Sequence, residues 1–379
     1  MLIETSLASG RDILMGVARY VRGHQPWLLY HEPRGLEDNL PDWIGNWQGD
    51  GIIARIQTPA MADALLRTKL PVVDALGVVP NTGFPLICSD NDAIGRMAAE
   101  HLVELGLRNF AFLGIENEYW SEARENSFVA SLSRKQFEVS IRREHRHAAD
   151  RLTWEVYQSQ LVEWILTLPV PIGVMVCSDQ RCTAFLDACH RAKRAVPDDI
   201  AVIGVDNDEP LCGVCNPALT SVWPDHESIG YEAAVLLQRM MDGEKQPPAR
   251  TVLPPKFVVT RKSTDTLAVD DPVVFKSLRL IRRHACERID VDTIADRVGV
   301  SRSVLQRRFR SFLGRTVKEE LVARRLKTAQ DLLLNTKLSL AEIALRTGFQ
   351  HQEYMGAVFK SHLRTTPAAF RNRSQEVAN

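Results

Sequence analysis

The sequence lacks the features of proteins that enter membranes or pass through the secretory route. Among its 379 residues, no run approaches the 18 apolar residues that a membrane span requires, and the N-terminus has no signal-peptide pattern. The seven cysteines are odd in number and scattered, as in proteins of a reducing cytosol. These absences predict a cytoplasmic protein that does not engage a membrane.

The motifs of catalytic and cofactor chemistry are also missing. The sequence has no pattern of a nucleophile with histidine and acid, no glycine-rich phosphate loop and no His-Glu-x-x-His. Cys212 and Cys215 have the spacing of a metal or redox pair, but no second pair or nearby histidine cluster completes a site, which favours an incidental pair. We therefore expect a protein that is not an enzyme and needs no metal or cofactor.

A net charge of zero hides two regions of opposite charge. Residues 272–379 hold 21 Lys and Arg against 10 Asp and Glu, which leaves 26 basic and 37 acidic residues for the first 271 positions. By itself such a division is typical of solvated surfaces. Together with the helical patterns described next, it favours a nucleic-acid-binding module attached to an acidic, ligand-sensing body.

Ser339–Arg371 has the pattern of a helix-turn-helix unit, SLAEIALRTGFQHQEYMGAVFKSHLRTTPAAFR. Ser339 and Glu342 form a capping box that marks a helix start, and Gly348 can form a tight turn. A second helix is predicted from about Gln352 to about Ser361, with Tyr354, Met355, Val358 and Phe359 on its apolar side. Two short helices joined by a glycine-containing turn are typical of DNA-binding units.

The same pattern occurs about 49 residues upstream, in IDVDTIADRVGVSRSVLQRRFRSFLGRT. It predicts a helix over Thr293–Val298, a turn at Gly299, an N-cap at Ser301 and a second helix through about Ser311. Between the two units, a continuous helix is predicted over Thr316–Asn335. Such a helix would hold two recognition helices at a fixed spacing, which for successive major-groove faces must be roughly 34–36 Å.

Polar side chains on the outer faces of both second helices are candidate DNA contacts. The candidates are Arg302, Ser303, Gln306, Arg307, Arg308, Arg310, Gln350, His351, Gln352, Tyr354 and Lys360. Among these, Arg308, Arg310 and Lys360 are expected at phosphates, as is Arg371. Base contacts are expected from Arg302, Ser303, Gln306 and Arg307 in the first unit and from the region around His351, Gln352 and Tyr354 in the second.

The C-terminal hundred residues resemble the AraC/XylS family of DNA-binding domains. GFQHQEYMGAVFKSHLRTTPAAFR is similar to the family signature of Gly-Phe, Tyr, Phe-Lys and Thr-Pro followed by Phe-Arg. Arg364 departs from it, because the family usually has glycine there, so the resemblance does not define the turn before Thr365. A helical dimerisation module without DNA contact is the alternative interpretation.

The first 265 residues have an α/β pattern, in which helical segments alternate with short apolar runs. Strands are predicted at Leu2–Thr5, Trp27–Tyr30, Gly51–Ala54, Val72–Val73, Leu86–Ser89, Phe110–Gly114, Ile172–Cys177 and Val202–Val205. Helices are predicted at Arg11–Arg22, Pro59–Thr68, Asp92–Leu105, Ala123–Lys135, Trp154–Leu168, Arg181–Ala192 and Glu227–Met241. This order indicates parallel, doubly wound sheets, which bind ligands at the carboxyl ends of their strands.

This region resembles the LacI/periplasmic-binding-protein class. The stretches that carry the resemblance are SDNDAIGRMAAEHLVELGLRNFAFLG, IAVIGVDND and LTSVWPDHESIGYEAAVLL. The resemblance implies two lobes with a ligand between them, joined by crossovers that we expect near Gly106–Asn109, Asp208–Cys215 and Met241–Gln246. It divides the chain into a sugar-sensing domain (1–265) and a DNA-binding domain (266–379, with units at about 291–311 and 339–361), linked through Ser263–Val273.

Candidate sugar ligands follow from the chemistry of vicinal hydroxyls and less polar ring faces. Asp206 ends a predicted strand and could accept two hydroxyls, and Arg124 could fork across two hydroxyls or orient Asp206. Ser178 and Asp179 stand at the Asn-Asp position of the resembled class, and Trp120 and Trp223 could stack on the sugar. Each has an ordinary alternative as a cap, a surface residue or a core residue. Asp90 and Asn91 are more simply an N-cap.

The combination of both halves resembles the family of xylose-operon activators. Matching details are GDGIIARI, Trp120 with the Arg124–Glu125 pair, GVDND and LPPKFVVTRKSTD. The resemblance implies a D-xylose-activated transcription activator that binds promoter repeats in double-stranded DNA as a homodimer and works with RNA polymerase. Two alternatives stay open: a regulator that senses another sugar or polyol, and a sugar-processing enzyme fused to a DNA-binding module.

Overall fold

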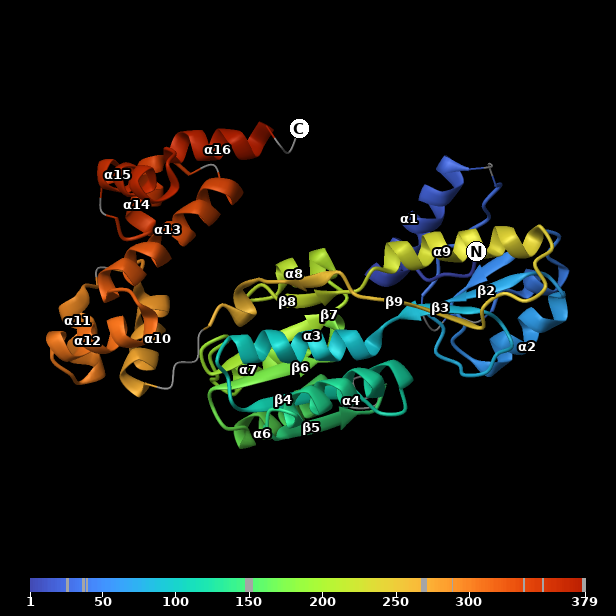
Figure 1. Ribbon diagram of the computed structural model, residues 1–379, viewed down its shortest axis with the longest axis horizontal. Helices are drawn as coiled ribbons and strands as arrows, with labels where there is room; N and C mark the ends of the chain where they lie inside the picture. The colour runs from blue at the N-terminus through green and yellow to red at the C-terminus, as the bar shows by residue number, and fades with distance from the viewer. Residues whose placement is uncertain are drawn as a thin grey trace. The chain divides into compact units, whose positions relative to one another are not determined.

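The computed structural model describes residues 1–24, 27–35, 38, 40–146, 153–266, 271–287, 289–336, 338–349 and 351–376. These residues form two compact units, Met1–Thr266 and Leu267–Asn379 (Figure 1). The first unit is α/β with largely parallel sheets and the second is all-helical, which confirms the predicted fold class. Among the described helices, none has the length and hydropathy to cross a membrane.

The first unit consists of two lobes, each built on its own sheet (Figure 1). The sheet of the first lobe has the order β1 (Ile52–Ala54), β2 (Val72–Ala75), β3 (Leu86–Ser89) and β9 (Arg250–Leu253). The sheet of the second lobe has the order β10 (Phe257–Val259), β8 (Thr220–Trp223), β7 (Ile200–Val205), β6 (Ile172–Val176), β4 (Phe110–Ile115) and β5 (Val139–Glu144). All pairs are parallel except β10 with β8.

Helices cover the sheets because the strands are apolar on both faces. Every residue of β4, β6 and β7 is buried, as expected for parallel strands between two helical layers. The helices of the first unit are α1 (Ala8–Gly23), α2 (Pro59–Thr68), α3 (Asn91–Glu104), α4 (Tyr119–Ser133), α6 (Trp154–Thr167), α7 (Asp179–Arg191), α8 (Glu209–Val214) and α9 (His226–Met241). Short 3-10 turns follow at Asp42–Asn46 and Lys262–Thr264.

The three crossovers between lobes were wrongly predicted from the sequence. They lie between β3 and α3, between β8 and α9, and between β9 and β10, since α3 packs on α4 of the second lobe and α9 packs on α1 of the first. The side chains of Asp90 and Asp225 cap the helices that begin at the first two crossovers, accepting from Ala93 N and Ser228 N. The chain therefore changes lobe at two capped helix starts and once between two strands, in each case at a different place from the one that we expected.

Two predicted strands are absent from the described structure. Leu2–Thr5 makes only an isolated bridge, from Leu2 to Ala54, and Trp27–Tyr30 is irregular. The second segment is held by other contacts: Trp27 Nε1 donates to Gln238 Oε1 (2.8 Å), and the Tyr30 ring packs edge-on against Trp43. An apolar run alone therefore did not distinguish a strand from a segment anchored through its aromatic side chains.

The predicted linker, Ser263–Val273, is only partly a linker. Ser263 and Thr264 are buried in the second lobe, Pro272 and Val273 begin the first helix of the second unit, and residues 267–270 lie outside the described residues. Asp271 caps that helix, with its Oδ1 accepting from Val273 N (2.8 Å) and Val274 N (3.1 Å).

The second unit consists of two small helical cores that share one long helix. Its helices are α10 (Pro272–His284), α11 (Val291–Val298), α12 (Arg302–Leu313), α13 (Val317–Asn335), α14 (Leu340–Arg346), α15 (Gln352–Leu363) and α16 (Pro367–Glu376). Helix α13 contributes Val317 and Leu321 to the core with α10–α12, and Leu326 and Leu333 to the core with α14–α16. The shared helix thus fixes the two halves to each other by hydrophobic packing.

Local sequence signals specify the ends of these helices as predicted. Capping boxes are present at Thr316 with Glu319 and at Ser339 with Glu342, and Ser301 caps α12. Gly299 is left-handed (φ 76°), as its predicted turn requires.

Arg364 adopts a left-handed conformation (φ 54°) after α15, at the position where the resembled family has glycine. A residue with a Cβ atom pays about 1–2 kcal/mol to adopt the left-handed backbone conformation, and glycine avoids this cost. Glycine offsets part of the gain because its backbone loses more conformational freedom on folding. We expect Arg364→Gly to stabilise the second unit by about 0.5–1 kcal/mol, which is roughly 2–6 °C in its calorimetric midpoint. Ala357→Gly, inside α15, should instead destabilise by about 1 kcal/mol. A lower midpoint for Arg364→Gly would contradict the strain.

Candidate functional site

A cavity of about 1120 Å³ lies between the lobes of the first unit. Both lobes line it: the first through the ends of β1, β2 and β3, and the second through the ends of β4, β6 and β7. These are the carboxyl ends of parallel strands, where α/β proteins bind small ligands. Of the residues predicted to bind sugar, those that line the cavity are Trp120, Arg124, Ser178, Asp179 and Asp206.

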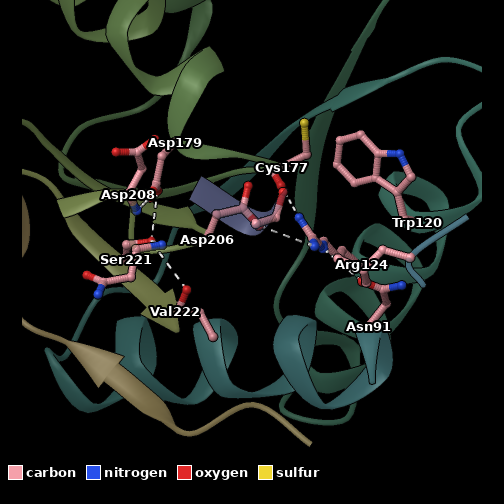
Figure 2. Close-up of polar contacts among 12 residues, drawn as sticks. Asn91, Trp120, Arg124, Cys177, Asp179, Asp206, Asp208, Ser221 and Val222 are labelled. Carbon is pink, nitrogen blue, oxygen red and sulfur yellow. Dashed lines mark hydrogen bonds and ion pairs between the residues drawn. The ribbon is translucent and has the colours of Figure 1, made fainter. Parts of the chain in front are cut away.

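Arg124 lies on α4 with its guanidinium fixed on three sides. Its Nε donates to Asn91 Oδ1 (3.0 Å), its Nη1 donates to the carbonyl oxygen of Cys177 (2.5 Å), and its Nη2 lies 3.8 Å from Asp206 Oδ1 (Figure 2). Burial lowers the pKa of Arg124 from its ordinary value, while the Asp206 carboxylate opposes the shift. The 3.8 Å gap leaves room for a ligand hydroxyl to bridge the two charges.

Asp206 follows β7 and has an unusual backbone conformation. Its φ is 109° and that of Asn207 is 50°, so two consecutive residues without glycine's freedom are held at positive φ. Such strain costs about 1–3 kcal/mol per residue and concentrates at ligand sites. Desolvation by burial raises the pKa of Asp206 to about 6, although Arg124 acts to lower it. Asp206 is therefore largely ionised at pH 7, with 28% of its side chain exposed to receive hydroxyl donors.

Asp179 is buried and already engaged by the protein. Its Oδ1 accepts from Ser221 Oγ (2.8 Å), and its Oδ2 accepts from Asp208 N (2.9 Å) (Figure 2). The same Oδ2 also accepts from Cys212 Sγ (3.3 Å). Burial and the Asp206 carboxylate raise the pKa of Asp179 to about 8. These contacts indicate that Asp179 stabilises the loop after β7, because both of its oxygens already accept hydrogen bonds from the protein.

The two tryptophans proposed for stacking lie in different environments. Arg124 packs over the Trp120 ring, with 4.9 Å between its Cζ and the ring centroid, and Trp120 Nε1 donates to Glu118 Oε2. Trp223 is not among the cavity-lining residues. It pairs with Phe257 across β8 and β10, and Lys256 Nζ lies 4.4 Å from its ring centroid. Of these two tryptophans, Trp120 lines the cavity and Trp223 does not.

The first lobe contributes polar groups that the sequence interpretation missed. Three residues that line the cavity have buried polar atoms without a hydrogen-bond partner in the described structure. These atoms are both polar atoms of the Gln57 amide, Ser89 Oγ and His226 Nδ1. Burial, reinforced by Arg55 and Arg124, lowers the pKa of His226 to about 3, so its ring is neutral. Gln57 follows β1 and Ser89 ends β3, so the rule of carboxyl strand ends could have identified these two.

Helix α12 buries its apolar residues and exposes most of the residues that were predicted to contact DNA. Leu305 and Phe309 are buried, whereas Arg302, Ser303, Arg307 and Arg310 are exposed and Gln306 is half-buried. Arg302 Nη1 is paired with Asp292 Oδ2 (2.8 Å) on the exposed surface. Arg308 turns toward α10, where its Nη1 pairs with Asp271 Oδ2 (2.8 Å). That pair supports the cap of α10, which is a structural contact that the sequence interpretation did not anticipate.

Helix α15 presents a polar start and buries its apolar side. His351, Gln352 and Lys360 are exposed, and Gln350 lies outside the described residues. Tyr354, which the sequence placed on the apolar side, is 46% exposed and packs edge-on against Phe349. Arg371, predicted as a phosphate contact, instead donates from Nη2 to the carbonyl oxygen of Leu338 (2.7 Å).

Cys212 and Cys215 give no sign of a metal site. Among the described residues, no group of three or more His, Cys, Asp or Glu side chains is arranged to hold a metal ion. Cys212 is buried and contacts Asp179. Burial raises the pKa of the Cys212 thiol, and the negative charge of Asp179 raises it further.

Comparison with known protein families identifies both units. Residues 99–264 match the family model of the periplasmic binding protein-like domain, and residues 294–373 match that of the helix-turn-helix domain. The first match covers most of the second lobe together with α9 and β9 of the first, and the second match covers most of both helix-turn-helix units.

Known relatives match the chain over its whole length. It is 33% identical over 387 aligned positions to the xylose operon regulatory protein of Escherichia coli K12, covering all of this chain and 97% of the relative. The protein of the same name from Haemophilus influenzae is 31% identical over 98% of this chain and 97% of its own length.

A solved structure is also similar to the chain over nearly its whole length. It is described as the structure of the xylose-binding transcription activator xylR, with a TM-score of 0.79, 32% identity and coverage of 98% of this chain and 96% of its own. The chain therefore belongs to the family of xylose operon regulatory proteins and is a sugar-responsive transcription regulator with a DNA-binding helix-turn-helix domain.

Proposed function

We propose that the chain is an activator that senses D-xylose through the cavity of residues 1–265 and reads promoter DNA through residues 266–379. The observation that carries the proposal is the Arg124–Asp206 pair, which faces the same cavity as the unpartnered polar atoms of Ser89 and His226. A sugar presents hydroxyls on several sides, so it can form hydrogen bonds with the polar groups of both lobes at once. The names of the relatives support xylose as the sugar.

The proposed contacts divide by lobe. In the second lobe, Asp206 accepts two adjacent hydroxyls, Arg124 donates to one of them, and Trp120 covers the less polar ring face, with Ser178 at the margin. In the first lobe, neutral donors and acceptors on Gln57, Ser89 and His226 meet the remaining hydroxyls. Each of these buried polar atoms needs a hydrogen-bond partner, and a buried group left without one costs about 1–3 kcal/mol, so sugar hydroxyls that bind here satisfy them.

The proposed mechanism is a shift between an open and a closed arrangement of the lobes. A sugar that binds both walls stabilises the closed arrangement more than the open one, which is the only way in which a ligand shifts such an equilibrium. Closure then changes how the DNA-binding units of a homodimer engage promoter repeats, and the bound activator engages RNA polymerase. We infer that this takes place in the cytoplasm and that the sugar leaves unchanged. Turnover of a sugar by the chain would contradict that last inference.

Calorimetry against a panel of sugars tests the choice of ligand. D-Xylose should give strong binding heat, while L-arabinose, D-ribose, D-glucose and xylitol should bind more weakly because they place hydroxyls differently. No heat with D-xylose beside strong heat with another sugar or polyol would transfer the proposal to that ligand. No heat with any of them would contradict a sugar-binding cavity.

The affinity for D-xylose should depend on pH through Asp206. The raised pKa, about 6, means that acidification protonates the acceptor that two hydroxyls need. Affinity should fall about tenfold between pH 7 and pH 5. The stability of the ligand-free protein should respond in the opposite direction: the folded carboxyl holds its proton more tightly than the unfolded one, so this group stabilises the fold more as the pH falls from about 6 to about 4. Calorimetric titrations across pH 5–7 measure the first trend, and thermal scans across pH 4–7 measure the second.

A further inference from the structure

Arg261 connects the loop of the proposed sugar site with the end of the first unit. It stands between β10 and the 3-10 turn Lys262–Thr264. Its Nη2 donates to Asn207 Oδ1 (2.8 Å), and its Nη1 donates to the carbonyl oxygen of Leu219 (2.9 Å). Its backbone N donates to Thr220 Oγ1 (2.8 Å). One side chain thus spans the loop after β7, the start of β8 and the segment that leaves the lobe.

Asn207 lies between Asp206 and the contacts of Arg261. It follows Asp206 directly, and both residues have positive φ. Asn207 N also donates to Ser221 Oγ (3.0 Å), which in turn donates to Asp179 Oδ1. A ligand that pulls on the Asp206 carboxylate therefore acts on a strained pair whose second member is held by Arg261.

The residues after Arg261 are fixed to the same lobe by buried hydroxyls. Ser263 Oγ donates to the carbonyl oxygen of Val202 (2.6 Å) and accepts from Thr220 N (2.8 Å). Thr264 Oγ1 lies 2.8 Å from Thr220 Oγ1 and 3.0 Å from His101 Nε2. Both side chains are at most 1% exposed. The segment between Arg261 and Thr266 is therefore bonded to β7 and β8, the two strands between which the loop with Asp206 and Asn207 runs.

We propose that Arg261 is a positioning residue that couples occupancy of the sugar site to the path by which the chain leaves the sensor toward the DNA-binding unit. The proposal rests on the proposed function. A change at Arg261 should therefore leave the affinity for sugar unaltered, because Arg261 does not line the sugar site, and should reduce the effect of sugar on DNA binding. A general structural role would instead change both quantities together.

The test measures both properties in the full chain. Arg261→Met keeps the aliphatic stem and removes the donors, and Asn207→Gly removes the acceptor while suiting the positive φ. We expect both variants to bind D-xylose within twofold of the original affinity. The factor by which D-xylose changes promoter affinity should be at least fivefold smaller in both variants than in the original protein. Arg261→Lys, which can still donate to Asn207, should recover part of that change. The control Lys262→Ala, exposed and next in sequence, should behave like the original protein.

Three outcomes separate the possibilities. A full response to D-xylose in Arg261→Met and Asn207→Gly overturns the inference and leaves the proposed function intact. A parallel loss of sugar affinity and DNA response in Asn207→Gly also overturns it, because the contact then serves the site itself. If the original protein shows no effect of D-xylose on promoter binding, the proposed function fails, and the coupling role fails with it.

Discussion

Replacing Asp206 with asparagine should weaken D-xylose binding by about 100-fold or more. The change keeps the shape of the side chain and tolerates the positive φ, but it removes the charge that accepts two hydroxyls and faces Arg124 at 3.8 Å. Hydrogen bonds to charged groups contribute about 1.5–3 kcal/mol each, so two weakened bonds amount to about 3 kcal/mol, or roughly two orders of magnitude in Kd. Titration calorimetry at pH 7 measures the loss.

Thermal scans distinguish a damaged site from a damaged fold. Since burial raises the pKa of Asp206, its charge destabilises the folded state at pH 7, and Asp206→Asn should leave the midpoint unchanged or higher. Asp187→Asn, an exposed carboxylate of α7 paired with Arg191, is the matched control and should bind D-xylose normally. Sugar affinity within threefold of the original in Asp206→Asn would remove Asp206 from the site. The pH dependence described above should also disappear in this variant.

The second large effect concerns Arg307. It lies on α12 opposite the buried Leu305 and Phe309 and is exposed, so it is free to reach a base edge. If it reads a guanine, Arg307→Ala should cost about 1–3 kcal/mol of promoter affinity and less on random DNA. Fluorescence anisotropy with both DNAs at one salt concentration measures the difference.

Arg308 supplies the contrast for this experiment. Its guanidinium pairs with Asp271, the cap of α10, so Arg308→Ala should lower the thermal midpoint of the second unit while affecting promoter and random DNA alike. Equal losses on both DNAs for Arg307→Ala would instead make Arg307 a phosphate contact.

Sequence alone could place a residue at the cavity where its position follows directly from a local pattern. Asp206 comes immediately after an apolar strand, and Arg124 lies in a motif that the resembled class shares. Both line the cavity. Gln57 and Ser89 were within reach of the same strand-end argument. His226 was not, because its place in the cavity depends on the crossover between β8 and α9, and local patterns do not report which lobe a helix packs against.

Failures elsewhere have a similar cause. Strands β9 and β10 are only four and three residues long and partly exposed, so their apolar residues form shorter runs than those of the central strands. Trp223 pairs with Phe257 on β10 and is not among the cavity-lining residues, and β10 had not been predicted. Helix caps were predicted well because the capping groups lie within three residues of each other.

The affinity of the full chain for its candidate promoter, measured with and without saturating D-xylose, tests the central claim most directly. A sugar that stabilises the closed arrangement of the lobes should change that affinity by about 5–150-fold, the usual range of coupling between two sites. Promoter binding that is specific but identical with and without D-xylose would contradict the account.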